Sequence, residues 1–178
     1  MPFHARDGLK YFTFESLADQ PLTHGAFTRQ GGVSEAPWAS LNMSLTVGDT
    51  PERVQANKRL AFEALGRDIA GFGDSWLVHG RDVLIYDEPG PPDANNQTKA
   101  DIILTNHPDV TLFMRYGDCV PLLFYDPEHH AAGLAHAGWR GTMIDVAGAT
   151  VAAMSQRYGS DPAQMIAAIG PSISAENY

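Results

Sequence analysis

The sequence predicts an α+β fold with mixed or antiparallel sheets flanked by helices. Apolar runs of strand length outnumber the helical segments heavily, and they occur in clusters along the chain. The 178 residues are enough for one compact domain with a hydrophobic core, and no internal repeat or clear linker divides them. We therefore expect a single domain over residues 1–178.

Two segments have the periodicity and end signals of helices. The first begins at Asp49-Thr50-Pro51-Glu52, which offers a cap, an early proline and a capping-box glutamate, and it stops at Gly66. The second begins near Arg140 and ends at Gly159. Its apolar face comprises Met143, Val146, Ala147, Thr150, Val151 and Met154.

The remaining apolar runs have the length and composition of strands, whereas the prolines and glycine of Glu88–Gln97 predict a loop. The predicted strands are Leu22–Thr28, Ser75–His79, Val83–Tyr86, Asp101–Thr105, Val110–Tyr116, Cys119–Tyr125, Ala131–His136 and Met165–Ile169.

One predicted hairpin brings two reactive residues together. The turn Asp126–His130 joins the strand that begins at Cys119 to the strand that ends at His136. The turn alone does not decide whether the two side chains share a face of the sheet.

Three registers of this hairpin are open. If Tyr125 faces His130, the cysteine and the histidine lie directly opposite each other. If Asp126 faces Ala131, they are diagonal neighbours on one face. If Tyr125 faces Ala131, they point to opposite faces, because side chains alternate along a strand.

Charge and composition exclude several classes of function. The net charge is −9, with 12 Lys and Arg against 21 Asp and Glu and no basic patch, so we expect no binding to nucleic acid. No run of eighteen apolar residues predicts a membrane span, and the N-terminus lacks the basic and apolar blocks of a signal peptide. Together with a single cysteine, this predicts a cytoplasmic protein that does not bind membranes.

The only cysteine, Cys119, lies in Arg115-Tyr-Gly-Asp-Cys-Val-Pro121, and the nearby histidine lies in His136-Ala-Gly-Trp-Arg-Gly141. A buried small thiol beside a hydrogen-bonded histidine is one interpretation. A thiolate and imidazole site suited to zinc or copper is a second, and a cysteine nucleophile with a histidine base is a third. Spacing alone does not separate them.

His79 can add a third ligand to such a site. It lies in Trp76-Leu-Val-His-Gly-Arg81, where a turn histidine without a role fits the spacing equally well. Three protein ligands with an open fourth position are typical of catalytic zinc.

Arginines and isolated polar residues give candidates for substrate binding. Arg140 stands where the second helix begins, and amides and a guanidinium there suit an anion. Arg29 lies in a glycine turn that either approaches a phosphate or carboxylate or is merely solvated. Asn42 and Asp118 are capping groups or substrate contacts, and Asp101 is interpreted as a turn residue at the start of a strand.

Taken together, these segments resemble the YfiH-like family, labelled multicopper polyphenol oxidases or laccases and regarded as purine nucleoside phosphorylases. The matching segments occur in the family's order and cover nearly the whole chain. They are Phe27-Thr-Arg-Gln-Gly-Gly-Val-Ser34, Ala39-Ser-Leu-Asn42, Val47-Gly-Asp49, Val78-His-Gly80, Gly117-Asp-Cys-Val-Pro-Leu122, His136-Ala-Gly-Trp-Arg-Gly141 and Ile169-Gly-Pro171.

The resemblance implies a metal site and an anion site. A mononuclear metal, usually zinc and alternatively copper, would be held by His79, Cys119 and His136. Arg29 and Arg140 match arginines placed to bind an anion such as phosphate. The implied fold is a YfiH-like, cysteine-hydrolase-like layered architecture.

The implied function is a zinc-dependent purine nucleoside phosphorylase. It would cleave adenosine, inosine or methylthioadenosine with phosphate and deaminate adenosine as a side activity, so its partners are a small nucleoside and phosphate. We expect a monomer or a homodimer. The predicted catalytic residues are Cys119, His136, Asp118 and Arg140, and the predicted substrate and phosphate contacts are Arg29, Asn42 and Arg140.

Other activities stay open. A metal-free or metal-assisted cysteine hydrolase or amidase would match the peptidoglycan editing reported for relatives. A copper polyphenol oxidase is disfavoured because the chain has seven histidines and no His-x-His pair. The motif of ordinary zinc nucleobase deaminases is absent as well. A non-catalytic binding protein is the remaining alternative.

The chain departs from the family in three places. Leu77 stands where the family commonly has glutamine, and Ser174–Tyr178 lacks the cysteines that many relatives carry there. The chain also ends where relatives continue through further strands and a helix. We therefore expect a domain that is incomplete at its C-terminus relative to the family.

Overall fold

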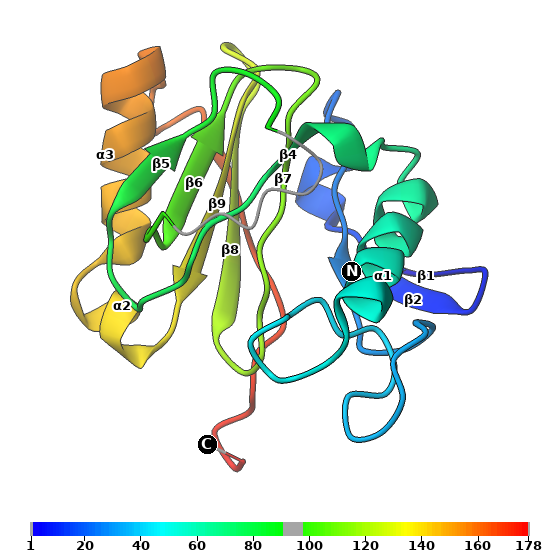
Figure 1. Cartoon of the computed structure of the whole chain (residues 1–178). Coiled ribbons are helices and arrows are strands. Elements are labelled where there is room, and N and C mark those ends of the chain that lie inside the picture. The colour runs from blue at the N-terminus through cyan, green and yellow to red at the C-terminus, as the bar shows by residue number, and fades with distance from the viewer. Residues whose placement is uncertain (1, 91–97, 178) are drawn as a thin grey trace. The chain divides into compact units, whose positions relative to one another are not determined.

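A computed structural model of the chain describes residues 2–90 and 98–177, so most of the predicted loop Glu88–Gln97 lies outside the described residues. The backbone divides into two compact units, Met1–Ile69 and Ala70–Tyr178 (Figure 1). Strands and a few helices occur in both units, which confirms the mixed α+β class. The single domain, the cysteine-hydrolase-like layering and the incomplete C-terminus stay predictions.

The first unit contains a three-stranded antiparallel sheet and one long helix. Strands β1 (Phe3–Arg6) and β2 (Leu9–Phe12) form a hairpin, and the short β3 (Ala26–Phe27) pairs with β2. The predicted strand Leu22–Thr28 is thus reduced to two residues. The turn Asp7-Gly8 has positive φ at both residues, 51° and 84°, which is the geometry that an Asp-Gly hairpin turn favours.

Helix α1 (Pro51–Ala64) begins and ends where the sequence predicts, with Pro51 in its first turn and Gly66 just beyond its end. Short 3₁₀ helices occupy Glu15–Leu17 (η1) and Ile69–Gly71 (η2). Residues Leu9, Leu41 and Ala64 form a small core, against which partly buried Tyr11, Phe27, Met43 and Leu60 pack.

A buried amide of α1 organises the irregular chain between β3 and α1. Asn57 is fully buried, and its Oδ1 accepts the N–H of Val33 at 2.8 Å. Its Nδ2 donates to Ser34 Oγ and to the carbonyl oxygens of Ser40 and Asn42, at 2.8, 3.2 and 2.8 Å. One helical side chain therefore fixes the loop that carries the Phe27–Ser34 and Ala39–Asn42 motifs.

The second unit is built on a five-stranded mixed sheet in the order β10-β8-β9-β6-β5. Only β5 and β6 are parallel, and the other neighbours are antiparallel. A separate parallel pair joins β4 and β7. The strands are β4 (Phe72–Gly73), β5 (Val83–Ile85), β6 (Ile102–Thr105), β7 (Thr111–Leu112), β8 (Val120–Asp126), β9 (Ala131–Ala137) and β10 (Ile166–Ile169).

The predicted second helix is two helices, α2 (Trp139–Met143) and α3 (Val146–Tyr158). The break lies at Asp145, whose backbone is left-handed with φ 59° and ψ 54°, and whose carboxylate accepts the N–H of Gly148 at 3.0 Å. An aspartate side chain that caps a new helix thus interrupts the apolar stripe. Gly159, with φ 79°, ends α3 as predicted.

Helices α2 and α3 lie on one face of the sheet, next to β9 and β6 (Figure 1). Between helix and sheet is the main core, formed by Ile102, Leu104, Phe124, Ala131, Ala135, Ala137, Val146 and Met154. No helix in the described part of the chain is long and apolar enough to cross a bilayer.

Replacing Asn57 with alanine should destabilise the protein by about 3 kcal/mol, because buried backbone and side-chain groups would lose their partners. Urea unfolding measures this effect. Asn106→Ala, at an exposed position, should change stability by less than about 0.5 kcal/mol. Equal unfolding free energies for the two variants would contradict the organising role of Asn57.

Candidate metal centre

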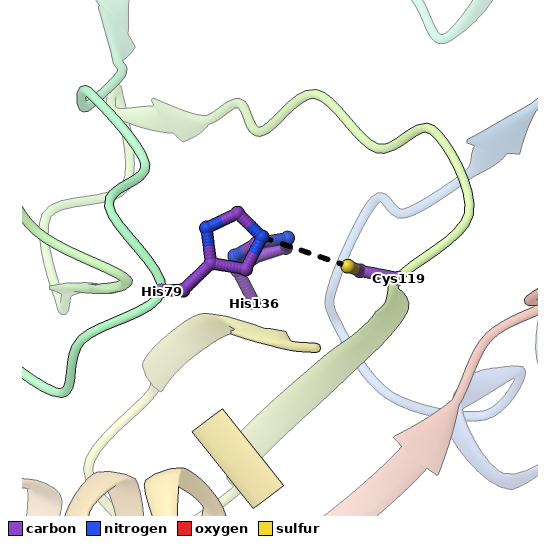
Figure 2. A group of neighbouring side chains, drawn as sticks. All are labelled: His79, Cys119 and His136. Carbon is purple, nitrogen blue, oxygen red and sulfur yellow. Dashed lines mark hydrogen bonds between the residues drawn. The ribbon is translucent and has the colours of Figure 1, made fainter. Parts of the chain in front are cut away.

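Three side chains from separate segments of the second unit meet at one end of its sheet. His79 comes from the loop before β5, Cys119 directly precedes β8, and His136 belongs to β9. Their ligand atoms all lie within 4.8 Å of one another. Figure 2 shows the side chains gathered together, with Cys119 Sγ 3.9 Å from His79 Nε2. The two imidazole rings meet edge to face, with centroids 4.8 Å apart.

The β8–β9 hairpin settles which of the three registers brings Cys119 to His136. Asp126 faces Ala131, and further along the ladder Pro121 faces His136. Cys119 is two residues from Pro121, so it is the diagonal neighbour of His136 on the same face. The second of the three registers is therefore the observed one.

A fully buried carboxylate links the two histidines. Asp101 Oδ1 lies 2.8 Å from His136 Nδ1 and accepts the N–H of His79 at 2.9 Å. Its Oδ2 accepts the N–H groups of Val78 and Gly80 at 3.1 and 2.7 Å. Burial opposes ionisation, but the hydrogen bonds from His136 and the three amides outweigh it and hold the pKa of Asp101 below its ordinary value.

These contacts explain two errors of the sequence analysis. The predicted strand Ser75–His79 does not form, and Trp76 makes only an isolated bridge with Lys99. The amides that follow turn to the carboxylate of Asp101 instead of to a neighbouring strand. Asp101 is also more than the expected turn residue. The sequence signal for its buried role was its position directly before Ile102–Leu104, a wholly apolar stretch that predicts a buried strand.

The surroundings and chemistry of the three side chains fit a metal ion. A Cβ on Gly138 would stand 2.8 Å from Cys119 Sγ and 3.0 Å from His79 Cδ2, so only glycine leaves this side of the cluster open. Two imidazoles and a thiolate suit zinc or copper. Three ligands with a vacant fourth position are typical of a catalytic rather than a structural zinc site.

The thiol itself is poorly suited to act as a nucleophile without a metal. Burial raises the pKa of Cys119, and the neighbouring Asp118 and then Asp101 raise it further. Nucleophilic cysteines have the opposite property, a lowered pKa. A cation among the three side chains reverses this balance, because coordination deprotonates a thiol.

The remaining predicted residues have different surroundings. In the second unit, Asp118 is exposed directly before Cys119, and Arg140 is exposed in α2, four residues after His136. In the first unit, Arg29 is exposed and its carbonyl oxygen accepts two amide protons from residues 40 and 41.

Asn42 contributes to the shape of its own loop. Its Nδ2 donates to Ser44 O and Asp49 Oδ2, both at 2.9 Å, and its Oδ1 accepts the N–H of Ser44 at 3.0 Å. Its predicted contact with substrate stays a prediction.

Residues 23–178 match the family described as multi-copper polyphenol oxidoreductase laccase. The chain belongs to this laccase-like family. Within the described residues of this family member, one cluster of three His, Cys, Asp or Glu side chains is arranged to hold a metal. Its three side chains offer one ligand atom each to a metal ion, whereas the family description names several coppers.

The laccase-like chain is also similar to curated and solved relatives. It is 38% identical over 156 residues to a purine nucleoside phosphorylase of Streptomyces coelicolor, covering 87% of this chain and 63% of that protein. The structures of YlmD from Geobacillus stearothermophilus and YfiH from Bacillus licheniformis match with TM-scores of 0.87 and 0.89 at 33% and 31% identity. Each match covers 99% of this chain and 67% of the other.

Gly138→Ala should weaken zinc binding by about tenfold. This is the lower end of the loss of metal affinity that follows when residues around metal ligands are changed. The reason is that the added Cβ would displace Cys119 or His79. Competition with a chromogenic chelator measures the affinity. Gly117→Ala is the matched control, since its Cβ would meet no atom within 4 Å and it lies two residues before Cys119. Equal zinc affinity in both variants would contradict the assigned site.

Proposed function

We propose that this chain carries the metal centre of a zinc-dependent purine nucleoside phosphorylase. The substrates would be adenosine, inosine or methylthioadenosine together with phosphate. The observation that carries the proposal is the convergence of His79, Cys119 and His136, in a chain that is 38% identical to a relative named for this activity. The chain spans 63% of that relative's length, and the proposal concerns the residues present here.

The three ligands would hold the ion with one coordination position open to reactants. A zinc ion held there would supply Lewis acidity and would lower the pKa of a bound water toward ~7. The protein's own contribution is to fix the ligands. Asp101 holds His136, the register of β8 and β9 places Cys119, and Gly138 leaves room beside both Cys119 and His79.

An exposed arginine is proposed to bind the phosphate. A guanidinium presents paired donors that match the oxygens of a phosphate. Arg140 is proposed for this role, because it is exposed and lies four positions after the metal-site histidine in sequence. Arg29 stays a predicted contact of phosphate.

Asp118 is proposed to contact the departing purine. Its carboxylate is exposed and directly precedes Cys119 in sequence, so it is available to accept a hydrogen bond from a base N–H. We include adenosine deamination as a side activity, for which an activated water is the required reactant.

A metal-free cysteine hydrolase is the second candidate, and one observation favours it. Asp101 orients His136 as the acidic member of a catalytic triad orients its histidine. The raised pKa of Cys119 opposes this alternative. Metal content and substrate preference distinguish the two functions.

The proposed function is tested by product analysis of adenosine incubated with phosphate. We expect the parent chain to hold about one zinc ion and to release adenine and ribose 1-phosphate. Cys119→Ala should lose both properties, and inosine in the parent reaction would report deamination. A parent that holds zinc but forms no product from the three nucleosides would refute the phosphorylase. A parent that hydrolyses a cell-wall precursor without zinc would favour the second candidate.

Removing the Arg140 guanidinium should raise the KM for phosphate by about tenfold or more, since a hydrogen bond to a charged group contributes about 1.5–3 kcal/mol. The KM for the nucleoside should change little. Steady-state rates of Arg140→Ala at varied phosphate measure the effect. Arg157→Ala is a control, because Arg157, on α3, is also a solvent-exposed arginine but pairs with Asp87. Loss of phosphate affinity in the control alone would refute the assignment.

A further inference from the structure

We propose that Asp101 is the positioning residue that makes both histidines of the metal centre competent ligands. It acts on the ring of His136 and on the backbone of His79. The inference rests on the metal centre of the proposed function, but it concerns a residue that is itself no ligand.

The first action of Asp101 selects the protonation pattern of His136. The carboxylate and the ring nitrogen Nδ1 are 2.8 Å apart, and both side chains are almost completely buried. Three backbone N–H groups donate to the two oxygens of Asp101, so the carboxylate acts as an acceptor here and the proton of this contact lies on Nδ1. A neutral imidazole then has its lone pair on Nε2, the nitrogen left to bind the metal. The carbonyl oxygen of Asp101 also accepts the backbone N–H of His136 at 2.9 Å, which fixes the strand position.

The second action holds His79 in an unusual backbone conformation. His79 has φ 60°, in the left-handed region that non-glycine residues rarely occupy. Such a conformation persists only where the surroundings enforce it. Here the consecutive amides of Val78, His79 and Gly80 all point at the one carboxylate, as in the anion-binding nests of other proteins. The position of the His79 ring therefore depends on Asp101.

Asp101 is not a fourth ligand. A carboxylate offers about four acceptor positions. Four donors already occupy them, namely three backbone N–H groups and the N–H of His136. The described cluster of side chains able to hold a metal consists of the two histidines and Cys119 without it.

Asp101→Asn is the direct test, since it preserves size but replaces one acceptor oxygen with an NH₂ group. At least one of the four donors would then face another donor. We expect zinc to bind about 10- to 100-fold more weakly, the usual effect of removing the partner of a metal-binding histidine. Chelator competition with zinc alone measures the affinity, and thermal unfolding measures stability separately.

Asp126→Asn is a closely matched control in the same sheet. Asp126 is also buried, and its carboxylate accepts the backbone N–H groups of Glu128 and His129 and lies 2.7 Å from His129 Nδ1. It lies at the turn end of the β8–β9 hairpin, opposite to the end that carries Cys119 and His136. This variant should lose stability like Asp101→Asn but keep the zinc affinity of the parent.

Nitrogen-15 NMR of the histidines in the metal-free parent tests the inference without any variant. His136 should carry its proton on Nδ1, and zinc should shift the Nε2 resonance. A proton on Nε2, or equal zinc affinity in Asp101→Asn and the parent, would overturn the role of Asp101 alone. A parent that binds no zinc would overturn the metal centre and this inference with it.

Discussion

The carboxylate of Asp101 and its four N–H donors form the interaction on which the candidate site depends. A buried charge is strongly unfavourable unless hydrogen bonds replace its hydration, and here every acceptor position of the carboxylate has a donor. Because Asp101 directly precedes β6, this fully buried interior strand sets where the charge stands. The loop of residues 78–80 then takes its shape from the charge and not from a ladder of its own.

Cys119 is positioned by a different constraint, the register of a hairpin. A slip of one residue between β8 and β9 would send its side chain to the other face of the sheet. The ladder of seven residue pairs from Val120 opposite Ala137 to Asp126 opposite Ala131 prevents this slip. Two ligands thus follow from one buried carboxylate and the third from strand pairing, and Gly138 keeps the space beside them open.

The motif residues of the site could be predicted from the sequence, whereas their arrangement could not. The sequence identified His79, Cys119 and His136 but left three hairpin registers open, because the turn residues suit each of them. Asp101 was missed because a lone aspartate before a strand usually has a local role, and its partners lie at least 21 residues away. Local signals did predict both ends of α1 and the C-terminal end of α3, where proline and glycine act on their own backbone.

In both units, a buried polar side chain fixes a segment that has no regular secondary structure. In the first, the amide of Asn57 gathers main-chain and hydroxyl groups of the loop between β3 and α1. In the second, the carboxylate of Asp101 gathers the amides before β5. In both cases a polar side chain, within a helix for Asn57 and directly before a strand for Asp101, satisfies backbone groups that would otherwise be buried without partners. Motif segments can therefore hold defined positions as loops, which explains why strand patterns failed to describe them. A motif residue can therefore serve either to contact reactants or to hold its loop in shape. The hydrogen bonds of Asn42 to Ser44 and Asp49 are of the kind that holds the loop.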